Sequence, residues 1–261
     1  MLARKHILSI NVSVGTQQDF VDEIFQFSDL KQSAYICFAN VHMLVEAYNS
    51  HTFNNVVNSA DIVAPDGFPV AKSFGLMYGI KQGRIDGTGV MRRVLSACLL
   101  RQKKVFFYGG TQRMLNSAVV YLKLNYPGLQ VAGMFSPPFR QLEPTEKKDV
   151  TDAIRLSGAD FVFVVLGCPK QEAWMHEMKG EFPAVMLGIG GALPMILGMQ
   201  QRAPVWVQQI GFEWLCRLMQ EPGRLFQRYT FTNSKFLYLL AAELCRIQLR
   251  KIRPTVWPKI N

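Results

Sequence analysis

The chain has 261 residues, of which 49% are hydrophobic, and its 29 Lys and Arg against 19 Asp and Glu give a net charge of +10. With a mean hydropathy of +0.08, this composition excludes an intrinsically disordered chain, and the length suffices for one large domain, or one domain with an appendage. The longest apolar stretch, residues 236–244, is too short to span a bilayer and contains Glu243.

Strand patterns alternate with amphipathic helix patterns in the first three quarters of the chain. Strands are predicted over 7–14, 35–39, 61–64, 104–108, 129–134, 161–166 and 184–188. Helices are predicted over 17–27, 41–49, 89–101, 113–125, 145–157 and 170–179. This alternation predicts an α/β, Rossmann-like fold with a mostly parallel sheet and helices on both faces. Residues 161–166 are apolar at every position, as a central strand requires.

Only helical patterns follow residue 201, so we expect an α/β catalytic domain at 1–201 and a helical, basic appendage at 202–261. The appendage carries ten Lys and Arg against three Glu. Pro204 can start a helix, and helical spacing predicts that this helix buries Trp206, Ile210, Trp214 and Leu218. Its arginines suit bidentate contacts to phosphates, namely Arg217, Arg224 and Arg228. The alternative is a basic helix that merely keeps the chain in solution.

The appendage is apolar as well as basic, which favours an anionic membrane surface over nucleic acid as its partner. Its predicted apolar face consists of Phe231, Phe236, Leu237, Leu239, Leu240 and Leu244. Arg246, Arg250, Lys251 and Arg253 add positive charge beside that face. The alternative is that these helices pack on the body or form a homo-oligomer contact.

Other sequence features concern the cellular compartment. The five cysteines stand at 37, 98, 168, 216 and 245, without metal-type spacing, which is typical of reduced thiols. The first residues show no signal-peptide pattern. We therefore expect a cytoplasmic protein that is peripheral on the inner face of the cytoplasmic membrane.

Polar clusters follow several predicted strands, at the edge where an open α/β sheet binds its ligands. They are Asn40-Val-His42, Pro65-Asp66-Gly67, Gly109-Gly110-Thr111 and Gly167-Cys-Pro-Lys-Gln171-Glu172. Each cluster alone is weak evidence. Their convergence on one edge predicts a ligand site there.

Asp66 stands between a proline and a glycine, which hold it at a defined point of a tight turn. It can act as a general base towards a hydroxyl, or it can form an Asx turn or cap the helix that begins near Phe68. Asn40 has the same two alternatives, a site residue or a helix cap. His42 is either a catalyst or a wall residue.

Two glycine motifs can be compared with phosphate-binding turns. Gly109-Gly110 can leave N–H groups free for a phosphate, or it can form an ordinary strand-to-helix turn. Gly188-Ile-Gly190-Gly191 starts like a dinucleotide fingerprint, but Leu193 stands where the third glycine belongs. We find no metal-binding motif and no serine nucleophile elbow, so neither a metal nor a cofactor is expected.

Taken together in chain order, these clusters closely resemble the WecG/TagA/CpsF family, glycosyltransferase family 26. The resemblance covers roughly residues 7 to 229. It rests on Asn40, Pro65-Asp66-Gly67, Arg84 with Gly87, Gly109-Gly110, Gly167-x-Pro-Lys-Gln-Glu172, Gly188-x-Gly-Gly191, Arg202-Ala-Pro204 and Gly211-Phe-Glu-Trp-Leu-x-Arg-Leu-x-x-Glu-Pro-x-Arg224.

The resemblance implies an inverting, metal-independent transferase that moves a sugar from a UDP donor to a sugar linked to polyprenyl pyrophosphate. It implies that Asp66 is the base. Expected substrate-binding residues are Asn40, Arg84, Gly109, Gly110, Gln171, Glu172, Gly190, Arg217, Arg224 and Arg228. Pro194 stands where relatives usually carry Asp, so this chain lacks the donor contact that such a carboxylate could make. Within the resemblance, the donor sugar is open among N-acetylmannosamine, its uronic acid and glucose. The alternatives are a nucleotide-dependent oxidoreductase and a non-catalytic module that binds membranes or polyanions.

Overall fold

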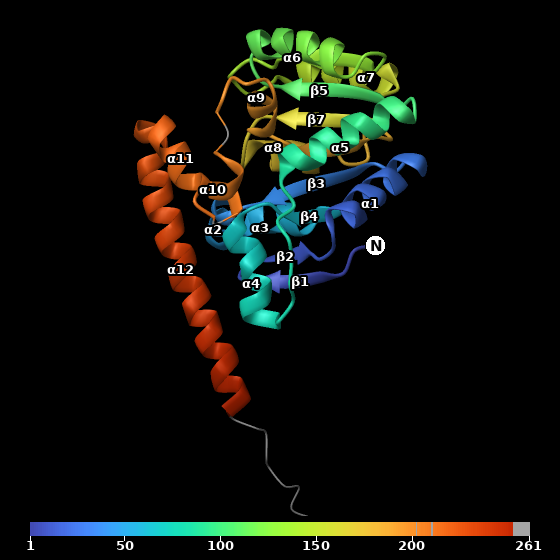
Figure 1. Ribbon diagram of the computed structural model, residues 1–261. Helices are drawn as coiled ribbons and strands as arrows, with labels where there is room; N and C mark the ends of the chain where they lie inside the picture. Colours follow the sequence, from blue (N-terminus) through green and yellow to red (C-terminus); the bar gives the residue numbers. More distant parts are fainter. Residues whose placement is uncertain (202, 210, 253–261) are drawn as a thin grey trace, which may run out of the picture.

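The computed structural model describes residues 1–201, 203–209 and 211–252, and its centre is a six-stranded sheet (Figure 1). The strands lie in the order β4-β3-β8-β7-β5-β6, and every neighbouring pair is parallel. Their bounds are β3 (Ala34–Ala39), β4 (Ile62–Pro65), β5 (Lys104–Gly109), β6 (Gln130–Phe135), β7 (Phe161–Val165) and β8 (Val185–Gly188). The predicted α/β, Rossmann-like fold is confirmed.

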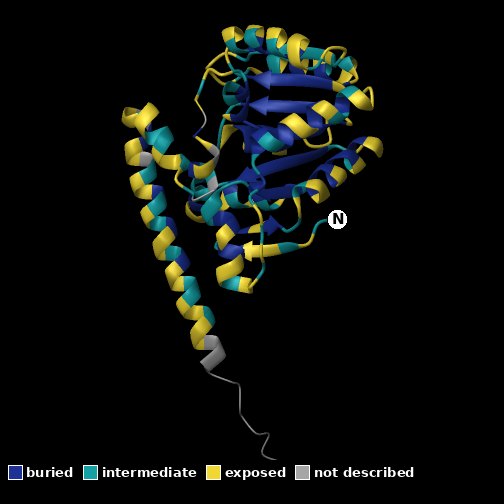
Figure 2. Cartoon of the chain, viewed as in Figure 1, coloured by how far each residue is buried: buried dark blue, intermediate teal, exposed yellow. Residues whose placement is uncertain are grey.

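Two layers of helices cover the sheet, and successive strand residues point into opposite layers. Tyr35 and Cys37 of β3 pack into one hydrophobic cluster, whereas Ile36 and Phe38 pack into the other. The first layer contains α2 (Val41–Asn49), α3 (His51–Asn58), α4 (Phe68–Tyr78), α7 (Pro144–Ser157) and α8 (Lys170–Met178). The second contains α1 (Gln17–Asp29), α5 (Gly87–Leu100), α6 (Gln112–Asn125) and α9 (Ala192–Ile196). Strands β3, β4, β7 and β8 are buried at every position, whereas the outer faces of the helices are exposed (Figure 2).

The strand predicted over 7–14 is confirmed only in part, because this segment turns after Ile7 and forms part of a hairpin. β1 (Arg4–Ile7) and β2 (Ile10–Ser13) pair antiparallel in a separate two-stranded sheet. Leu8 turns the chain with a φ of 56°, a conformation that the sequence does not announce with a glycine or asparagine. The buried Ile7, Ile10 and Val12 stabilise the turn by packing on the first helix layer. Helix α3 was also not predicted; Ser50 caps it by accepting a hydrogen bond from Phe53 N at 3.2 Å.

The single helix expected after Pro204 is two helices, α10 (Val205–Gln209) and α11 (Glu213–Gln220). Gly211 separates them with a φ of 85°, and a Cβ there would lie 2.4 Å from the Phe68 ring. Only glycine combines this conformation with such a close approach. The break also overturns the predicted burial: Trp206 is 65% exposed and Trp214 is exposed, while Leu218 is half-buried and Ile210 lies outside the described residues.

The last helix, α12 (Pro222–Ile252), runs along the first layer beside α2 and α4 (Figure 1). Phe236 and Leu240 are buried in the main core cluster, and Leu244 packs against it. These side chains were expected on a membrane-facing surface, so that expectation is wrong for them: they pack on the body of the protein. Phe231 and Leu237 are exposed, and Leu239 is half-buried. No helix in the described part of the chain is both long and apolar enough to cross a bilayer.

Candidate functional site

A cavity of about 630 Å³ opens at the carboxyl ends of β3, β4, β7 and β8, with α11 and α12 on its far side. β3 and β8 lie side by side in the sheet, but they connect to strands on opposite sides of this pair. The chain continues from β3 to β4 on one side, and it arrives at β8 from β7 on the other side. Such a switch point leaves a crevice in which open α/β sheets bind ligands. Six predicted site residues line this cavity, namely Asn40, Asp66, Arg84, Gln171, Gly190 and Arg217.

Asp66 is presented to the cavity by the end of β4. Its backbone N–H and that of Gly67 both donate to Ala39 O, at 2.9 and 3.1 Å, which ties the turn to the end of β3. Gly67 occupies the N-cap position of α4 without a side-chain cap. The Asp66 carboxylate instead lies 3.3 Å from Nη2 of Arg84. The structural alternative, in which Asp66 caps α4, is therefore wrong.

The environment of Asp66 raises the pKa of its carboxyl from 3.8 to about 6. Burial is the largest cause; the Arg84 charge opposes it, Asp86 and Glu213 add to it, and Arg217 opposes it. About a quarter of the side chain, 24%, stays accessible from the cavity. A carboxylate with a pKa near neutrality that a ligand can still reach is suited to accept a proton from a hydroxyl.

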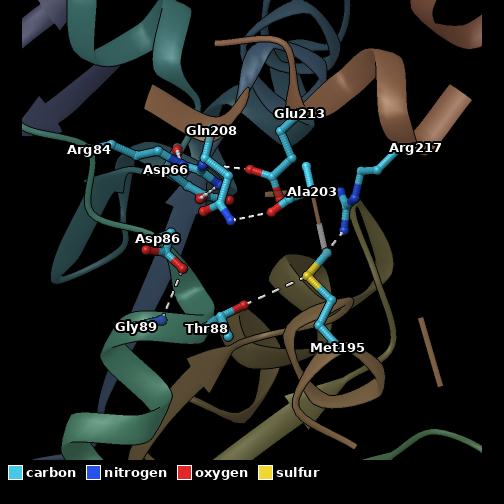
Figure 3. A network of polar contacts seen from close by, with 10 residues as sticks. All are labelled: Asp66, Arg84, Asp86, Thr88, Gly89, Met195, Ala203, Gln208, Glu213 and Arg217. Carbon is cyan, nitrogen blue, oxygen red and sulfur yellow. Dashed lines mark hydrogen bonds and ion pairs between the residues drawn. The ribbon is translucent and has the colours of Figure 1, made fainter. Parts of the chain in front are cut away.

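Arg84 connects Asp66 to the C-terminal helices. Its Nε donates to the Asp66 backbone carbonyl, and its Nη1 donates to Oε2 of Glu213 at 2.5 Å (Figure 3). Asp86 follows on the same loop and caps α5 by accepting from Gly89 N at 2.9 Å. We assigned no role to Glu213 or Asp86 from the sequence. Glu213 was nevertheless visible as one of few acidic residues in a basic segment.

Asn40 caps α2, because its Oδ1 accepts a hydrogen bond from Met43 N at 3.1 Å. The capping interpretation is confirmed, and the residue lies in the cavity wall as well. His42 also lines the cavity, with its Nδ1 3.7 Å from Oε1 of Glu46 one turn further along α2. Both residues therefore combine a place in the wall with a local helix contact.

Gln171 holds two walls of the cavity together. Its Oε1 accepts from Gly167 N at 3.1 Å, and its Nε2 donates to Gly188 O and to Oε1 of Glu172, both at 2.8 Å. A Cβ at Gly190 would lie 2.9 Å from the same Oε1, so this position is packed against Gln171. Gln171 thus joins the turns that follow β7 and β8.

Glu172 is fully buried behind Gln171 and does not line the cavity. Burial raises the pKa of its carboxyl to about 7, while hydrogen bonds from Gln171 and Cys168 act in the opposite direction. Burial places Glu172 where a substrate cannot reach it directly.

Gly109 and Gly110 lie outside the cavity lining. Gly110 N donates to Val165 O at 2.8 Å, and a Cβ at Gly109 would lie 2.5 Å from the same oxygen. Thr111 caps α6 through Met114 N at 3.2 Å. The N–H group of Gly110 is therefore engaged by β7, as in the ordinary strand-to-helix turn that we gave as the alternative, and β5 is separated from β8 by β7.

Arg217 reaches the cavity from α11. A Cβ at Gly191 would lie 3.2 Å from its Nη2, which is also 3.9 Å from the Met195 sulfur (Figure 3). Its Nε is buried and makes no hydrogen bond with the described residues. Arg224 and Arg228 belong to α12, but their side chains lie outside the part that the structure describes. Sequence reasoning missed Thr88 and Met195, whose Oγ1 and sulfur lie 3.8 Å apart beside Arg217.

Within residues 1–201, 203–209 and 211–252, no group of three or more His, Cys, Asp or Glu is placed to hold a metal ion. The polar groups that converge on the cavity are instead a carboxylate from β4, a guanidinium from the loop before α5, and a carboxylate and a guanidinium from α11. Such an arrangement can take a proton from a ligand at one point and stabilise an anion at another.

Comparisons with known proteins match this chain to one family of transferases. The model of the glycosyl transferase WecG/TagA/CpsF family matches residues 5–250. A protein of Bacillus spizizenii (strain W23), named N-acetylglucosaminyldiphosphoundecaprenol N-acetyl-beta-D-mannosaminyltransferase, is 33% identical over 80% of this chain and 83% of its own length. Proteins of the same name from Bacillus subtilis (strain 168) and Staphylococcus aureus (strain MW2) are 29% and 26% identical, over 82% and 85% of this chain and 82% and 87% of their own lengths. The chain is an enzyme of the transferase class and belongs to the WecG/TagA/CpsF family of glycosyl transferases.

Proposed function

We propose that this enzyme transfers N-acetylmannosamine from a UDP-sugar to N-acetylglucosamine linked to polyprenyl diphosphate. The acceptor and the transferred sugar come from the names of the relatives in Bacillus and Staphylococcus. The observation that carries the chemistry is the Asp66 carboxylate, which faces the cavity beside Arg84 with a pKa of about 6. UDP as the carrier, inversion at the sugar and independence of metal ions are parts of this proposal.

In the proposed reaction, Asp66 accepts the proton of the acceptor hydroxyl as its oxygen attacks C1 of the donor sugar. The bond between C1 and the diphosphate oxygen breaks, and its electron pair leaves with UDP. Attack opposite to the departing diphosphate inverts the configuration at C1. A base with a pKa near the working pH is the most effective, which agrees with the raised pKa of Asp66.

The departing diphosphate requires positive charge, which arginines can supply without a metal ion. Arg217 has a buried Nε without a hydrogen-bond partner among the described residues, and it lies beside the turn that follows β8. We assign Arg217 to the diphosphate, and Arg224 and Arg228 to the same role by their places in the family pattern. Asn40 lines the wall near Asp66, where it would contact a sugar, and Gln171 would hold the two turns around the substrate.

We further propose that residues 1–201 form the catalytic domain and that residues 202–261 bring it to the membrane and cover the cavity. Exposed apolar side chains occur on α10, on the N-cap residue of α11, on α11 itself and on the first part of α12: Trp206, Phe212, Leu215, Met219, Phe226 and Phe231. Side chains of this kind insert into the interface of a bilayer, and nearby Lys and Arg favour anionic lipids. We propose these residues as the membrane-binding surface in place of Phe236 and Leu240, which are buried.

The proposal is tested by incubating the full chain with a panel of UDP-sugars and a polyprenyl-diphosphate-linked N-acetylglucosamine, and by measuring UDP release and the disaccharide product. We expect turnover with UDP-N-acetylmannosamine and a product with inverted configuration. Turnover with a different UDP-sugar would correct the donor, whereas no UDP release with any donor would refute the proposed function.

A further inference from the structure

Arg84 lies between two carboxylates that come from opposite sides of the cavity. Asp66 stands at the end of β4, in the sheet, while Glu213 is the first residue of α11, 129 positions after Arg84. The Arg84 guanidinium uses Nη2 for Asp66 and Nη1 for Glu213 (Figure 3). A planar guanidinium has a fixed geometry, so its orientation towards one carboxylate constrains its orientation towards the other.

Helix α11 is tied to the rest of the protein at both of its ends. At its start, Glu213 accepts from Arg84 at 2.5 Å. At its end, Gln220 Nε2 donates to Gln201 O at 3.1 Å, and Gln200 Nε2 donates to Oε1 of Glu221 at 3.0 Å. Of these contacts, the one made by Glu213 is the one that reaches the neighbourhood of Asp66, and the Glu213 side chain is only 13% exposed. Charged pairs that are largely removed from water interact more strongly than exposed ones.

We propose that Glu213 is a positioning residue for catalysis: from α11, the Glu213 carboxylate holds Arg84 beside Asp66 and so keeps the base in the position that the reaction requires. This inference rests on the proposed function, because it takes Asp66 to be the base. The Glu213 carboxylate itself acts through Arg84 and through its charge, without a bond to the reacting atoms.

The charges around Asp66 agree with this role. Arg84 and the N-cap residue Asp86 come from the loop before α5. Glu213 and Arg217 come from α11, and His42 lines the same cavity from α2. Glu213 raises the pKa of Asp66 by its own negative charge, and its effect exceeds the opposite effect of Arg217. Of the two charges on α11, the negative charge of Glu213 therefore outweighs the positive charge of Arg217 at Asp66, which makes Asp66 a stronger base.

The substitution Glu213→Gln separates this role from a simple structural contact. Glutamine keeps the size of the side chain and one oxygen that can accept from Arg84, but it removes the negative charge. Loss of a neighbouring negative charge lowers the pKa of a carboxyl group. The matched control is Gln220→Ala, which weakens the other tie of α11 without changing any charge near Asp66.

The first measurement is the pH dependence of kcat/KM for the full chain and both variants. For Glu213→Gln we expect the acid limb to move roughly half to one unit towards lower pH, at the small end of the effect of a neighbouring charge. Because a weaker base transfers the proton less effectively, kcat at the pH optimum falls roughly threefold. Gln220→Ala leaves the limb in place. If the acid limb of Glu213→Gln coincides with that of the wild type, Glu213 makes only a structural contact and the proposal is overturned.

The second measurement does not depend on transferase activity. Carboxyl resonances of protein labelled with ¹³C in aspartate are followed as a function of pH, and Asp66→Asn identifies the Asp66 signal. We expect its titration midpoint to be lower in Glu213→Gln than in the wild type. If the wild-type enzyme releases no UDP, this titration still decides the role of Glu213. If the enzyme turns over but the midpoint is unchanged, the positioning role fails while the proposed function stands.

Discussion

Oδ1 of Asp66 lies 3.3 Å from Nη2 of Arg84, and the same guanidinium donates through Nε to the backbone carbonyl of Asp66. The pair fixes the carboxylate in the cavity wall, while burial raises its pKa to about 6 in spite of the neighbouring positive charge. Asp66 is therefore ionised at neutral pH and still basic enough to accept a proton.

Replacing the base is the first test of this arrangement. We expect Asp66→Asn to retain the fold and to lower kcat by about a hundred- to ten-thousand-fold, the usual contribution of a general base. Circular dichroism serves as the control for folding. A kcat within about threefold of wild type would show that Asp66 has only a structural role.

Removing the guanidinium from α11 tests the assignment of the leaving diphosphate. We expect Arg217→Ala to lower kcat by about a hundredfold, as does loss of one group that stabilises charge in a transition state. The matched control is Arg246→Ala, an exposed arginine of α12 that pairs with Glu243. Equal effects of the two substitutions on UDP release from a water-soluble acceptor analogue would contradict the assignment.

A milder substitution, at Gly191, tests whether the position of the Arg217 guanidinium matters for the reaction. Gly191 has a φ of −68°, which alanine also adopts, but a Cβ there would lie 3.2 Å from Nη2 of Arg217. We expect Gly191→Ala to displace the guanidinium slightly, so that UDP release slows severalfold while thermal unfolding is unchanged. Unaltered turnover would indicate that the observed position of Arg217 is not the one used in the reaction.

Chelation tests whether the arginines suffice for the diphosphate. We expect UDP release to continue at an unchanged rate in excess EDTA, because guanidinium groups supply the positive charge. The assay compares untreated enzyme, EDTA-treated enzyme, and treated enzyme with added magnesium or manganese. Loss of activity that either metal restores would refute metal independence.

Glu172 predicts how stability depends on pH. Burial raises its pKa from 4.5 to about 7, so the folded protein binds this proton more tightly than the unfolded chain does. The free energy of unfolding therefore falls as the pH rises between these two values. We expect Glu172→Gln to be the more stable protein at pH 7.5, by about 1 to 3 kcal/mol, and to lose this advantage near pH 4.

Urea unfolding at both pH values measures this difference. The matched control is Asp22→Asn, which alters an exposed carboxylate on α1. A stability advantage of Glu172→Gln that is equal at pH 4 and pH 7.5 would show that the Glu172 carboxyl does not titrate in this range.

Membrane docking can be tested without truncating α12, whose buried Phe236 and Leu240 belong to the core. We expect Met219→Ser with Phe226→Ser to weaken binding to vesicles of phosphatidylglycerol and phosphatidylcholine at low salt, because both side chains are exposed, at 68% and 64%. Leu156→Ser is the control, since this side chain is 86% exposed but belongs to α7, which is not part of the proposed membrane-binding segment. Equal vesicle binding by the double variant and the wild type would exclude docking through these residues.

Much of the architecture followed from local patterns in the sequence. The apolar run of β7 and the alternation of strands with helices predicted the parallel sheet, because periodic burial is encoded residue by residue. The position of Asp66 at a strand end was likewise visible in the sequence. The hairpin of β1 and β2 was missed because Leu8 turns the chain without a sequence feature that marks the turn.

What the sequence determined by itself is most of the strands and helices of the α/β body, the position of Asp66 at a strand end, and the resemblance to the family. The tertiary structure alone decided which strand ends meet: those of β3, β4, β7 and β8 form the cavity. The N–H of Gly110, after β5, instead donates a hydrogen bond to Val165 O. The tertiary structure also decided that Glu213 reaches Arg84 and that Phe236 faces the body. Strand order and long-range contacts depend on how separate elements pack together, and a local pattern carries no information about its distant partner.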